Sequence, residues 1–403
     1  MDVTGTSMKD KLYDLIVRIN ELSLYLVVFS MVFEYWDPLG FGDRLSIAFI
    51  SMLLYITSSL PFIKFNFNQS ILKRYIAPLL ILMVVSIVSA TINYNHVTNL
   101  IDIVDIRFVQ LVFLTFLISI HLGQKHILID NVLMIYVVCV CLMYLLYILN
   151  IGVIYEKGRL LLFGENPNMV GLKASIALIT AIYYIIHKIN YKKVLIGIIV
   201  CFPLINLIFL SASRGALVSS ILGILLMLFF MKISIVKKMF LIVIMVFSST
   251  FFMTYLMTSQ KVFYQRIENA INTGNTGRNI LWEGAFRIIE DNPFIGVSIP
   301  GMLPEMYKYS GIYNGPHNVY LYVLVTTGIL GFVFYMTFII RLGKKLYTDF
   351  KQTGMILYLT IFLVVLFNMF KAGGGINKIV FWFFFAICIA STLPKKGVPQ
   401  KSI

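Results

Sequence analysis

The sequence predicts an all-α, polytopic membrane protein with about 12 transmembrane helices. Apolar residues make up 59% of the 403 residues, charged residues make up only 13%, and the mean hydropathy is +0.89. A soluble chain needs about a quarter of charged residues to keep its surface wetted. The apolar residues also come in runs of about 20, the length over which a helix crosses the bilayer. Because backbone groups inside a bilayer must be satisfied within the span, these runs favour helices.

The apolar runs and one long polar stretch divide the chain into three parts. Residues 1–257 hold nine spans, residues 258–317 form a large hydrophilic loop, and residues 318–403 hold three further spans. The polar breaks between the runs set the boundaries of each span. The expected spans are residues 15–36, 45–63, 75–93, 107–122, 129–149, 168–187, 193–211, 214–231, 238–257, 318–340, 355–370 and 377–393.

Basic residues predict the side of the membrane on which each connection lies. With both termini inside, every inner segment is basic and nearly free of acid, whereas the short outer segments carry acidic side chains. Topology and lipid head groups therefore explain the formal charge of +15, without nucleic acid as a partner. The inner basic residues are Lys64, Lys73, Arg74, Lys125, Lys188, Lys192, Lys193, Lys232, Lys237, Lys238, Arg341, Lys344, Lys345, Lys351, Lys395, Lys396 and Lys401, and the outer acidic residues are Glu34, Asp37, Asp43, Asp102, Asp105, Glu156 and Glu165.

The loop over residues 258–317 is the longest connection, and this topology places it outside. A loop of this length within a compact protein is usually functional. Asn272–Gly277 is rich in turn-forming residues. The apolar residues of Asn279–Asp291 then recur at helical spacing, and Pro293 follows them. This pattern predicts an amphipathic helix that lies along the membrane surface or caps a cavity below it, and we expect the large periplasmic loop to contain short helices.

Arg214 lies in a very short outer connection, Ser211–Gly215, between two spans. An arginine at this depth is costly, and the small residues beside it let the backbone approach a ligand. We interpret Arg214 as a residue that binds a phosphate through two parallel hydrogen bonds. The alternative is an interfacial arginine that extends toward lipid head groups.

Arg278 directly precedes the helix expected in the long loop. Its charge adds to the positive N-terminal end of that helix, which predicts an anion site. A solvated loop arginine is the alternative. Trp282, one turn further along, offers either a face on which a sugar stacks or an anchor at the membrane interface.

His317 and Lys173 are two further candidate site residues. His317 ends the long loop just before a span, where a neutral imidazole would take a proton from an incoming hydroxyl. A histidine that merely caps the following helix is the alternative. Lys173 follows Asn166–Asn168, where the chain re-enters the membrane, and we expect this intramembrane lysine to line the cavity of the site.

The sequence predicts no metal site and no disulfide framework. No His, Glu and Asp residues stand together at metal-ligand spacing. All four cysteines lie within apolar runs, which is typical of small core residues. They are Cys139, Cys141, Cys201 and Cys388.

Four short motifs, in this order, resemble those of the O-antigen polymerase and O-antigen ligase superfamily of bacterial envelope enzymes. The resemblance covers about residues 160–335, and the first half of the chain matches only as a set of spans. Phe332 and Val333 stand where ligases often have two threonines, and no acidic residue follows shortly after His317, which favours a polymerase. The motifs are Asn166-Pro167-Asn168, Ser213-Arg214-Gly215, Gly277–Trp282 continued through Asp291–Gly296, and His317-Asn318 followed by Gly328–Gly331.

The resemblance implies a GT-C-like glycosyltransferase of the bacterial inner membrane with its active site facing the periplasm. It implies a glycan on undecaprenyl diphosphate as the donor. The acceptor is another lipid-linked glycan for a polymerase, or the lipid A core for a ligase. Membrane lipids and a chain-length regulator protein are further implied partners.

The resemblance also implies roles for single residues. The reaction would invert the anomeric carbon without a metal ion or other cofactor. Arg214 and Arg278 would hold the diphosphate, and His317 would act as the general base. Substrate-binding roles are expected for Asn318, Trp282, Asn168 and Lys173.

A transporter, including a flippase for lipid-linked sugars, is the competing class. Two-half transporters usually carry an internal repeat, and one common class has a long central loop between spans six and seven. Here that connection is the short stretch 187–193, and the long loop is off-centre. Basic and imidazole groups that gather on one face favour the enzyme.

Overall fold

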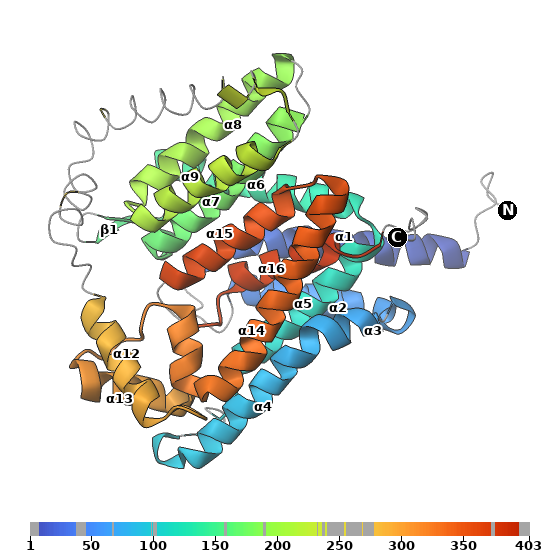
Figure 1. Cartoon of the computed structure of the whole chain (residues 1–403). Coiled ribbons are helices and arrows are strands. Elements are labelled where there is room, and N and C mark those ends of the chain that lie inside the picture. Colours follow the sequence, from blue (N-terminus) through green and yellow to red (C-terminus); the bar gives the residue numbers. More distant parts are fainter. Residues whose placement is uncertain are drawn as a thin grey trace.

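The part of the chain that the structure describes is built mainly from helices, with one short hairpin of strands (Figure 1). The structure is a computed structural model that describes residues 8–37, 46–66, 68–97, 99, 103–156, 159–187, 191–231, 233–235, 238–239, 254, 268, 278–371 and 375–394. Its elements are α1 (Met8–Val32), α2 (Ile47–Asn66), α3 (Gln69–Ile71), α4 (Ala77–Ile92), α5 (Ile106–Gln124), α6 (Ile127–Ile148), β1 (Val153–Glu156), β2 (Arg159–Leu162), α7 (Pro167–His187), α8 (Tyr191–Leu210), α9 (Arg214–Phe230), α12 (Asn279–Asp291), α13 (Ser298–Ser310), α14 (Val319–Thr353), α15 (Leu357–Lys371) and α16 (Ile379–Ser391).

Apolar helices make up most of the described chain. Six helical stretches are long and apolar enough to cross a membrane, and five shorter apolar helices accompany them. Each expected span falls on one of these helices, except the span at 238–257, which lies almost wholly outside the described residues, as does the turn at 272–277. The six stretches are Lys11–Val32, Gln69–Ile92, Ile106–Gln124, Ile127–Ile148, Pro167–His187 and Val319–Thr353, and the shorter helices are Ile47–Phe62, Ile199–Leu210, Arg214–Phe230, Leu357–Lys371 and Ile379–Ser391.

Three elements differ from the expectation. The hairpin β1–β2 makes the chain not purely helical, and its strands of four residues each are too short to give a periodic signal in the sequence. Helix α13 is one of the short helices expected in the long loop, but the sequence does not predict its position, because it holds Pro304 in its interior and an interior proline argues against a helix. Helix α14 runs on to Thr353, beyond the expected end at residue 340.

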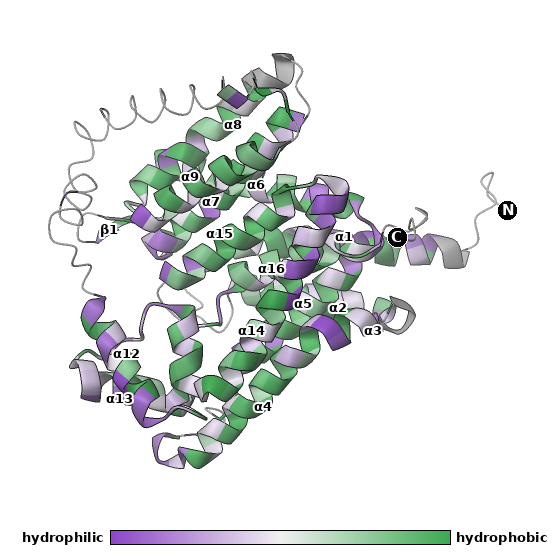
Figure 2. Ribbon diagram, in the orientation of Figure 1, coloured by the Kyte–Doolittle hydropathy of each residue, from purple (hydrophilic) through white to green (hydrophobic). Residues whose placement is uncertain are grey.

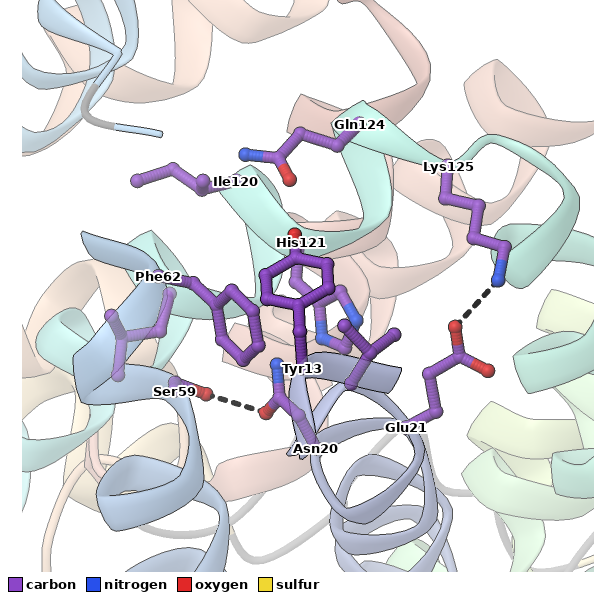
Figure 3. Close-up of a pocket in the computed structure, with 11 residues that line it drawn as sticks. Tyr13, Asn20, Glu21, Ser59, Phe62, Ile120, His121, Gln124 and Lys125 are labelled. Atoms are coloured by element: carbon purple, nitrogen blue, oxygen red, sulfur yellow. Dashed lines mark hydrogen bonds and ion pairs between the residues drawn. The ribbon is translucent and has the colours of Figure 1, made fainter. Parts of the chain in front are cut away.

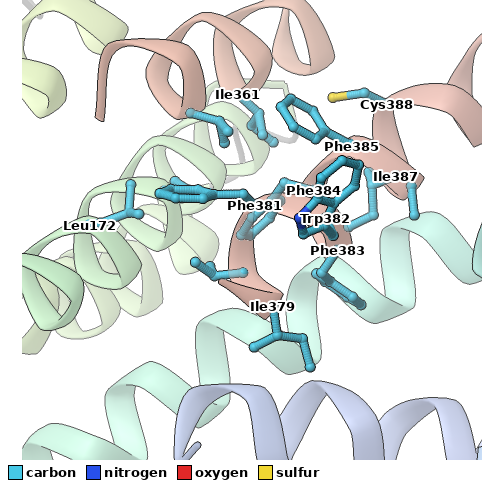
Figure 4. Close-up of a cluster of buried hydrophobic side chains, with 14 of the residues drawn as sticks. Leu172, Ile361, Ile379, Phe381, Trp382, Phe383, Phe384, Phe385, Ile387 and Cys388 are labelled. Carbon is cyan, nitrogen blue, oxygen red and sulfur yellow. The ribbon is translucent and has the colours of Figure 1, made fainter. Parts of the chain in front are cut away.

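Helix α16 forms the centre of the helical assembly (Figure 4). Every residue from Ile379 to Ala390 is at most 1% exposed. A helix that is apolar on all sides must be surrounded by apolar groups, and here neighbouring helices supply much of that surrounding. Helix α5 packs along α16, with the rings of Phe108 and Trp382 at 5.3 Å. The start of α5 therefore lies beside the start of α16.

Polar residues gather at the two ends of the helices (Figure 2). Helices α12 and α13 lie at one end, called here the α12 end, and α3 lies at the other (Figure 1). At the α3 end, the guanidinium of Arg341 donates to the carbonyl oxygen of Arg74 at 3.3 Å. Lys125 also lies at the α3 end, because the preceding Gly123 packs against Leu393, just past the end of α16. Three of the basic residues predicted to lie inside, Arg74, Arg341 and Lys125, thus lie at the same end of the molecule.

Two glycines let the loop after α12 dock against a break in α14. Gly328 has φ +61° and ψ −167°, which interrupts α14. The freed N–H groups of Ile329 and Leu330 donate to the carbonyl oxygens of Pro293 and Phe294, at 2.8 and 3.2 Å. A Cβ on Gly328 would lie only 2.3 Å from the backbone carbon of Phe294, and a Cβ on Gly296 would lie 2.5 Å from the oxygen of Val325. Backbone contact at both positions requires glycine.

Replacing Gly328 with alanine should detach this loop from α14. The backbone conformation is one that only glycine adopts readily, at a cost of about 1–3 kcal/mol for other residues, and the methyl group adds a clash with backbone that has no room to move. We expect a lower midpoint of thermal unfolding for the purified protein. Gly311→Ala is the matched control, because Gly311 also has positive φ but nothing within 4 Å of its Cβ position. Equal losses in both variants would contradict the steric explanation.

Candidate active site

Arg214 is held at the first position of α9 by a tight turn. The turn follows α8, and Ala212 within it has φ +47°. The hydroxyl of Ser213 caps α9 by accepting from the N–H of Ala216 at 3.3 Å. Gly171 of α7 packs against this turn so closely that a Cβ there would lie 2.7 Å from the hydroxyl of Ser211. The half-buried Arg214 therefore stands on a well-fixed backbone at the start of a helix.

Arg278 is the N-cap of α12, the helix that the sequence predicts over the same residues. Trp282, one turn on, ties α12 to two other segments. Its Nε1 donates to the carbonyl oxygen of Pro316 at 3.0 Å, and its ring meets the ring of Phe370 at 5.5 Å. Trp282 thus brings the start of α12 beside the segment that carries His317 and beside the end of α15.

His317 occupies a strained connection just before α14. Its φ is +53°, a backbone region that residues other than glycine rarely adopt. Such a conformation typically costs about 1–3 kcal/mol. The next residue, Asn318, is buried and caps α14, with its side-chain oxygen accepting from the N–H groups of Tyr320 and Leu321 at 2.9 and 3.2 Å. Strain of this kind is often found at functional sites.

The surroundings of His317 favour its neutral form. Burial of the imidazole, and secondly the nearby charge of Arg278, hold the pKa of His317 below its ordinary value of 6.5. The imidazole is therefore uncharged at neutral pH and has a nitrogen free of a proton. A neutral imidazole beside a guanidinium is suited to accept a proton from a hydroxyl.

Lys371 is a further cation at this site, and no motif in the sequence indicates it. It is the last residue of α15, and its Cδ lies 3.8 Å from the position that a Cβ on Gly215 would take. The charges that act on its ammonium group are those of Arg278 and Arg214. The preceding Phe370 packs on Trp282. The only signal in the sequence is a lysine at the outer end of a span.

Arg214, Arg278 and Lys371 form what we call the cation cluster. They come from the start of α9, the start of α12 and the end of α15, and His317 lies within range of the charge of Arg278. Like charges brought together repel one another, and a bound anion offsets this repulsion. The arrangement can therefore bind a phosphate or diphosphate beside a neutral imidazole.

Lys173 and Asn168, the other expected site residues, lie along the start of α7. The side chain of Lys173 is fully buried and forms an ion pair with Glu165, and its ammonium also donates to the carbonyl oxygen of Val32 at 3.2 Å. Asn168 is half-buried, and its backbone N–H donates to the side-chain oxygen of Asn166 at 2.9 Å. The contacts of Lys173 are thus with the protein, and substrate binding by these two residues stays a prediction.

Replacing Lys173 with alanine should destabilise the protein strongly. Removing one partner of a buried ion pair leaves an uncompensated charge, which costs about 3–5 kcal/mol. The measurement is the midpoint of thermal unfolding in detergent. The double variant Glu165→Gln/Lys173→Met removes both charges and should recover most of the loss. A double variant as unstable as Lys173→Ala would contradict this account.

The described residues offer nitrogen donors to an anion and no ready set of metal ligands. In the part of the chain that the structure describes, no three His, Cys, Asp or Glu side chains come together as a metal ion requires. The four cysteines are free thiols, and Cys139 and Cys388 are buried.

Comparison with known families bears directly on this site. Residues 198–336, about a third of the chain, match the family model described as O-antigen ligase. The match includes Arg214, Arg278, Trp282 and His317, and it ends before Lys371. No curated protein matches the chain. The family match confirms the resemblance over residues 198–336 of this multi-pass membrane protein: that segment is similar to the O-antigen ligase family, within the O-antigen polymerase and ligase superfamily.

Proposed function

We propose that the chain is a glycosyltransferase of the bacterial inner membrane that works on the periplasmic side. Its donor is a glycan on undecaprenyl diphosphate, and its acceptor is a sugar hydroxyl. The observation that carries the proposal is the cation cluster beside a neutral His317. Arg214, Arg278 and His317 lie in the segment that matches the family model. In this account the cluster lies at the periplasmic ends of α9 and α15, and both termini are cytoplasmic.

In the reaction that we propose, the transfer inverts the anomeric carbon. The bond between the anomeric carbon and the diphosphate oxygen breaks, and the lipid diphosphate leaves with the electron pair. The acceptor oxygen attacks from the opposite side while His317 takes its proton. Arg214, Arg278 and Lys371 hold the diphosphate as its negative charge grows, which is where fixed positive groups accelerate a reaction most. No step in this scheme calls for a metal ion.

Replacing Lys371 with glutamine should slow transfer by about tenfold to a hundredfold, because one of three cations that stabilise the leaving group is lost. The measurement is turnover of a diphosphate-linked glycan by purified protein. Lys308→Gln is the matched control, since Lys308 is exposed on α13 and ion-paired with Glu305 at 2.9 Å. Turnover of the Lys371 variant equal to that of this control would exclude Lys371 from the site.

Polymerase and ligase differ in the acceptor and share the donor and the site. Phe332 and Val333, where ligases often have threonines, favour the polymerase, which uses another lipid-linked glycan as acceptor. The family model is described as O-antigen ligase, which favours transfer to the lipid A core. We retain the polymerase as the first proposal and the ligase as the second. A chain-length regulator protein would be a partner of the polymerase.

The banding pattern of lipopolysaccharide from a strain lacking this protein tests both proposals. A core that carries a single repeat unit would support the polymerase, because ligation continues when polymerisation stops. Bare core together with accumulated lipid-linked polymer would support the ligase. An unchanged ladder would contradict both functions for this glycan and would favour another polysaccharide or the transport of lipid-linked sugars.

A further inference from the structure

A pocket of about 220 Å³ lies between α1, α2 and α5 (Figure 3). It stands at the α3 end, opposite the cation cluster. The last turn of α5 reaches it with His121 and Gln124, and Lys125 follows directly, whereas the first turns of α5 lie beside the start of α16. Helix α16 begins only a few residues after Lys371. The pocket is therefore separate from the candidate active site and plays no part in the proposed reaction.

One wall of the pocket carries an acid and a base in contact. The ammonium group of Lys125 lies 2.6 Å from a carboxylate oxygen of Glu21. Both side chains remain partly exposed, 54% for Lys125 and 19% for Glu21. An exposed ion pair contributes little to stability, so its two charges are available to a ligand at small cost.

A buried amide lies deeper in the pocket. Asn20 is only 4% exposed, and its side-chain oxygen accepts from the hydroxyls of Ser58 and Ser59 at 3.1 and 2.9 Å. Because the oxygen is used in this way, the amide nitrogen points among the lining residues (Figure 3). Gln124 adds a second amide to the lining. The pocket thus offers amide N–H donors in addition to the ion pair.

The helices that line the pocket also carry exposed apolar side chains outside its lining. Leu12 and Leu15 on α1 and Leu60 on α2 are each more than half exposed. In a membrane-spanning helix such side chains contact acyl chains. A ligand that reaches this pocket from the bilayer would have a polar head and apolar tails.

We propose that the pocket binds the head group of a zwitterionic phospholipid with a primary ammonium, such as phosphatidylethanolamine. Glu21 accepts hydrogen bonds from the ammonium, Lys125 binds the phosphate, and the amide nitrogen of Asn20 donates to a phosphate or ester oxygen. An anionic head group would meet the charge of Glu21, and a purely cationic one would meet that of Lys125. A choline head group has the charge but no N–H to donate to Glu21.

Native mass spectrometry of delipidated protein tests this site. Three lipids are added in turn: phosphatidylethanolamine, phosphatidylcholine and phosphatidylglycerol. We expect the first to bind most tightly. Glu21→Gln and Lys125→Gln should each weaken its binding by about tenfold, the loss of one hydrogen bond to a charged group. Lys125→Arg should retain binding, and Val17→Phe, which fills the pocket, should abolish it.

Lys345→Gln is the matched control. Lys345 lies at the same end of the molecule and is ion-paired with Asp349 at 2.5 Å, but it does not line the pocket. This variant should bind phosphatidylethanolamine as the unmodified protein does. Equal binding of the three lipids, undiminished binding by Val17→Phe, or an equal loss in the Lys345 variant would each overturn the proposal.

Discussion

Replacing His317 with glutamine should slow glycan transfer by purified protein by about 10²–10⁴-fold, the usual contribution of a general base. Glutamine keeps a polar side chain of similar reach but cannot take up a proton at neutral pH. Binding of the donor should change little, because the cation cluster remains in place. The account therefore predicts a fall in kcat with a nearly constant KM.

The control for this variant is His96→Gln. His96 also lies at the α12 end, where its Nε2 stands 3.8 Å from a carboxylate oxygen of Glu305 on α13. It lacks the strained backbone and the neighbouring guanidinium of His317. Near-wild-type turnover is expected for this control. The base assignment is wrong if His317→Gln turns over donor as fast as the His96 variant does.

Replacing Arg278 with glutamine should have two separate effects. Transfer should slow by about 10²–10³-fold, as when one fixed donor to a developing negative charge is removed. The acid limb of the pH–rate profile should also move to higher pH. Arg278 lowers the pKa of His317, so its removal raises that pKa, and the imidazole becomes protonated and inactive at a higher pH.

The measurement is kcat/KM as a function of pH for both proteins, because this ratio reports the pKa of the free enzyme. In the unmodified protein the acid limb should lie below pH 6.5, because burial and Arg278 both lower the pKa of His317. Arg287→Gln is the matched control, since Arg287 is exposed on the same helix. It should leave the rate and the profile unchanged. A slower Arg278 variant whose acid limb stays at the same pH would contradict the claim that the charge of Arg278 acts on the imidazole of His317.

The sequence predicts the local elements well where a strong pattern exists. The apolar spacing over Asn279–Asp291 gives the bounds of α12, and the apolar runs give the described membrane helices. Both features depend on periodicity within one segment, which the sequence displays directly. The hairpin β1–β2 and helix α13 lack such a pattern, so only the structure reveals them.

Contacts between distant segments are the part that a single sequence does not reveal. Lys371 joins the candidate site because α15 ends beside Gly215, and nothing near Lys371 in the sequence indicates this. The partner of Lys173 is likewise set by packing, which places Glu165 and the end of α1 around its ammonium group. A lysine in a span signals a function or a buried ion pair equally.

The structure also links two motifs that the sequence presents as separate. The segment Asp291–Gly296 and the glycine Gly328 meet through backbone hydrogen bonds at the break in α14. The glycines Gly296 and Gly328 are needed there for a physical reason, because a Cβ at either position would lie less than 3 Å from backbone atoms. This contact fixes the end of α12 against α14, and α14 begins next to His317.

A double-mutant cycle between Arg214 and Lys371 tests most directly whether the cation cluster is a single site for one anion. The kcat/KM for transfer is measured for the unmodified protein, Arg214→Gln, Lys371→Gln and the double variant. Groups that hold the same diphosphate are coupled, so the account predicts that the double loss differs from the product of the single losses by about threefold or more. Losses that simply multiply would contradict the shared site.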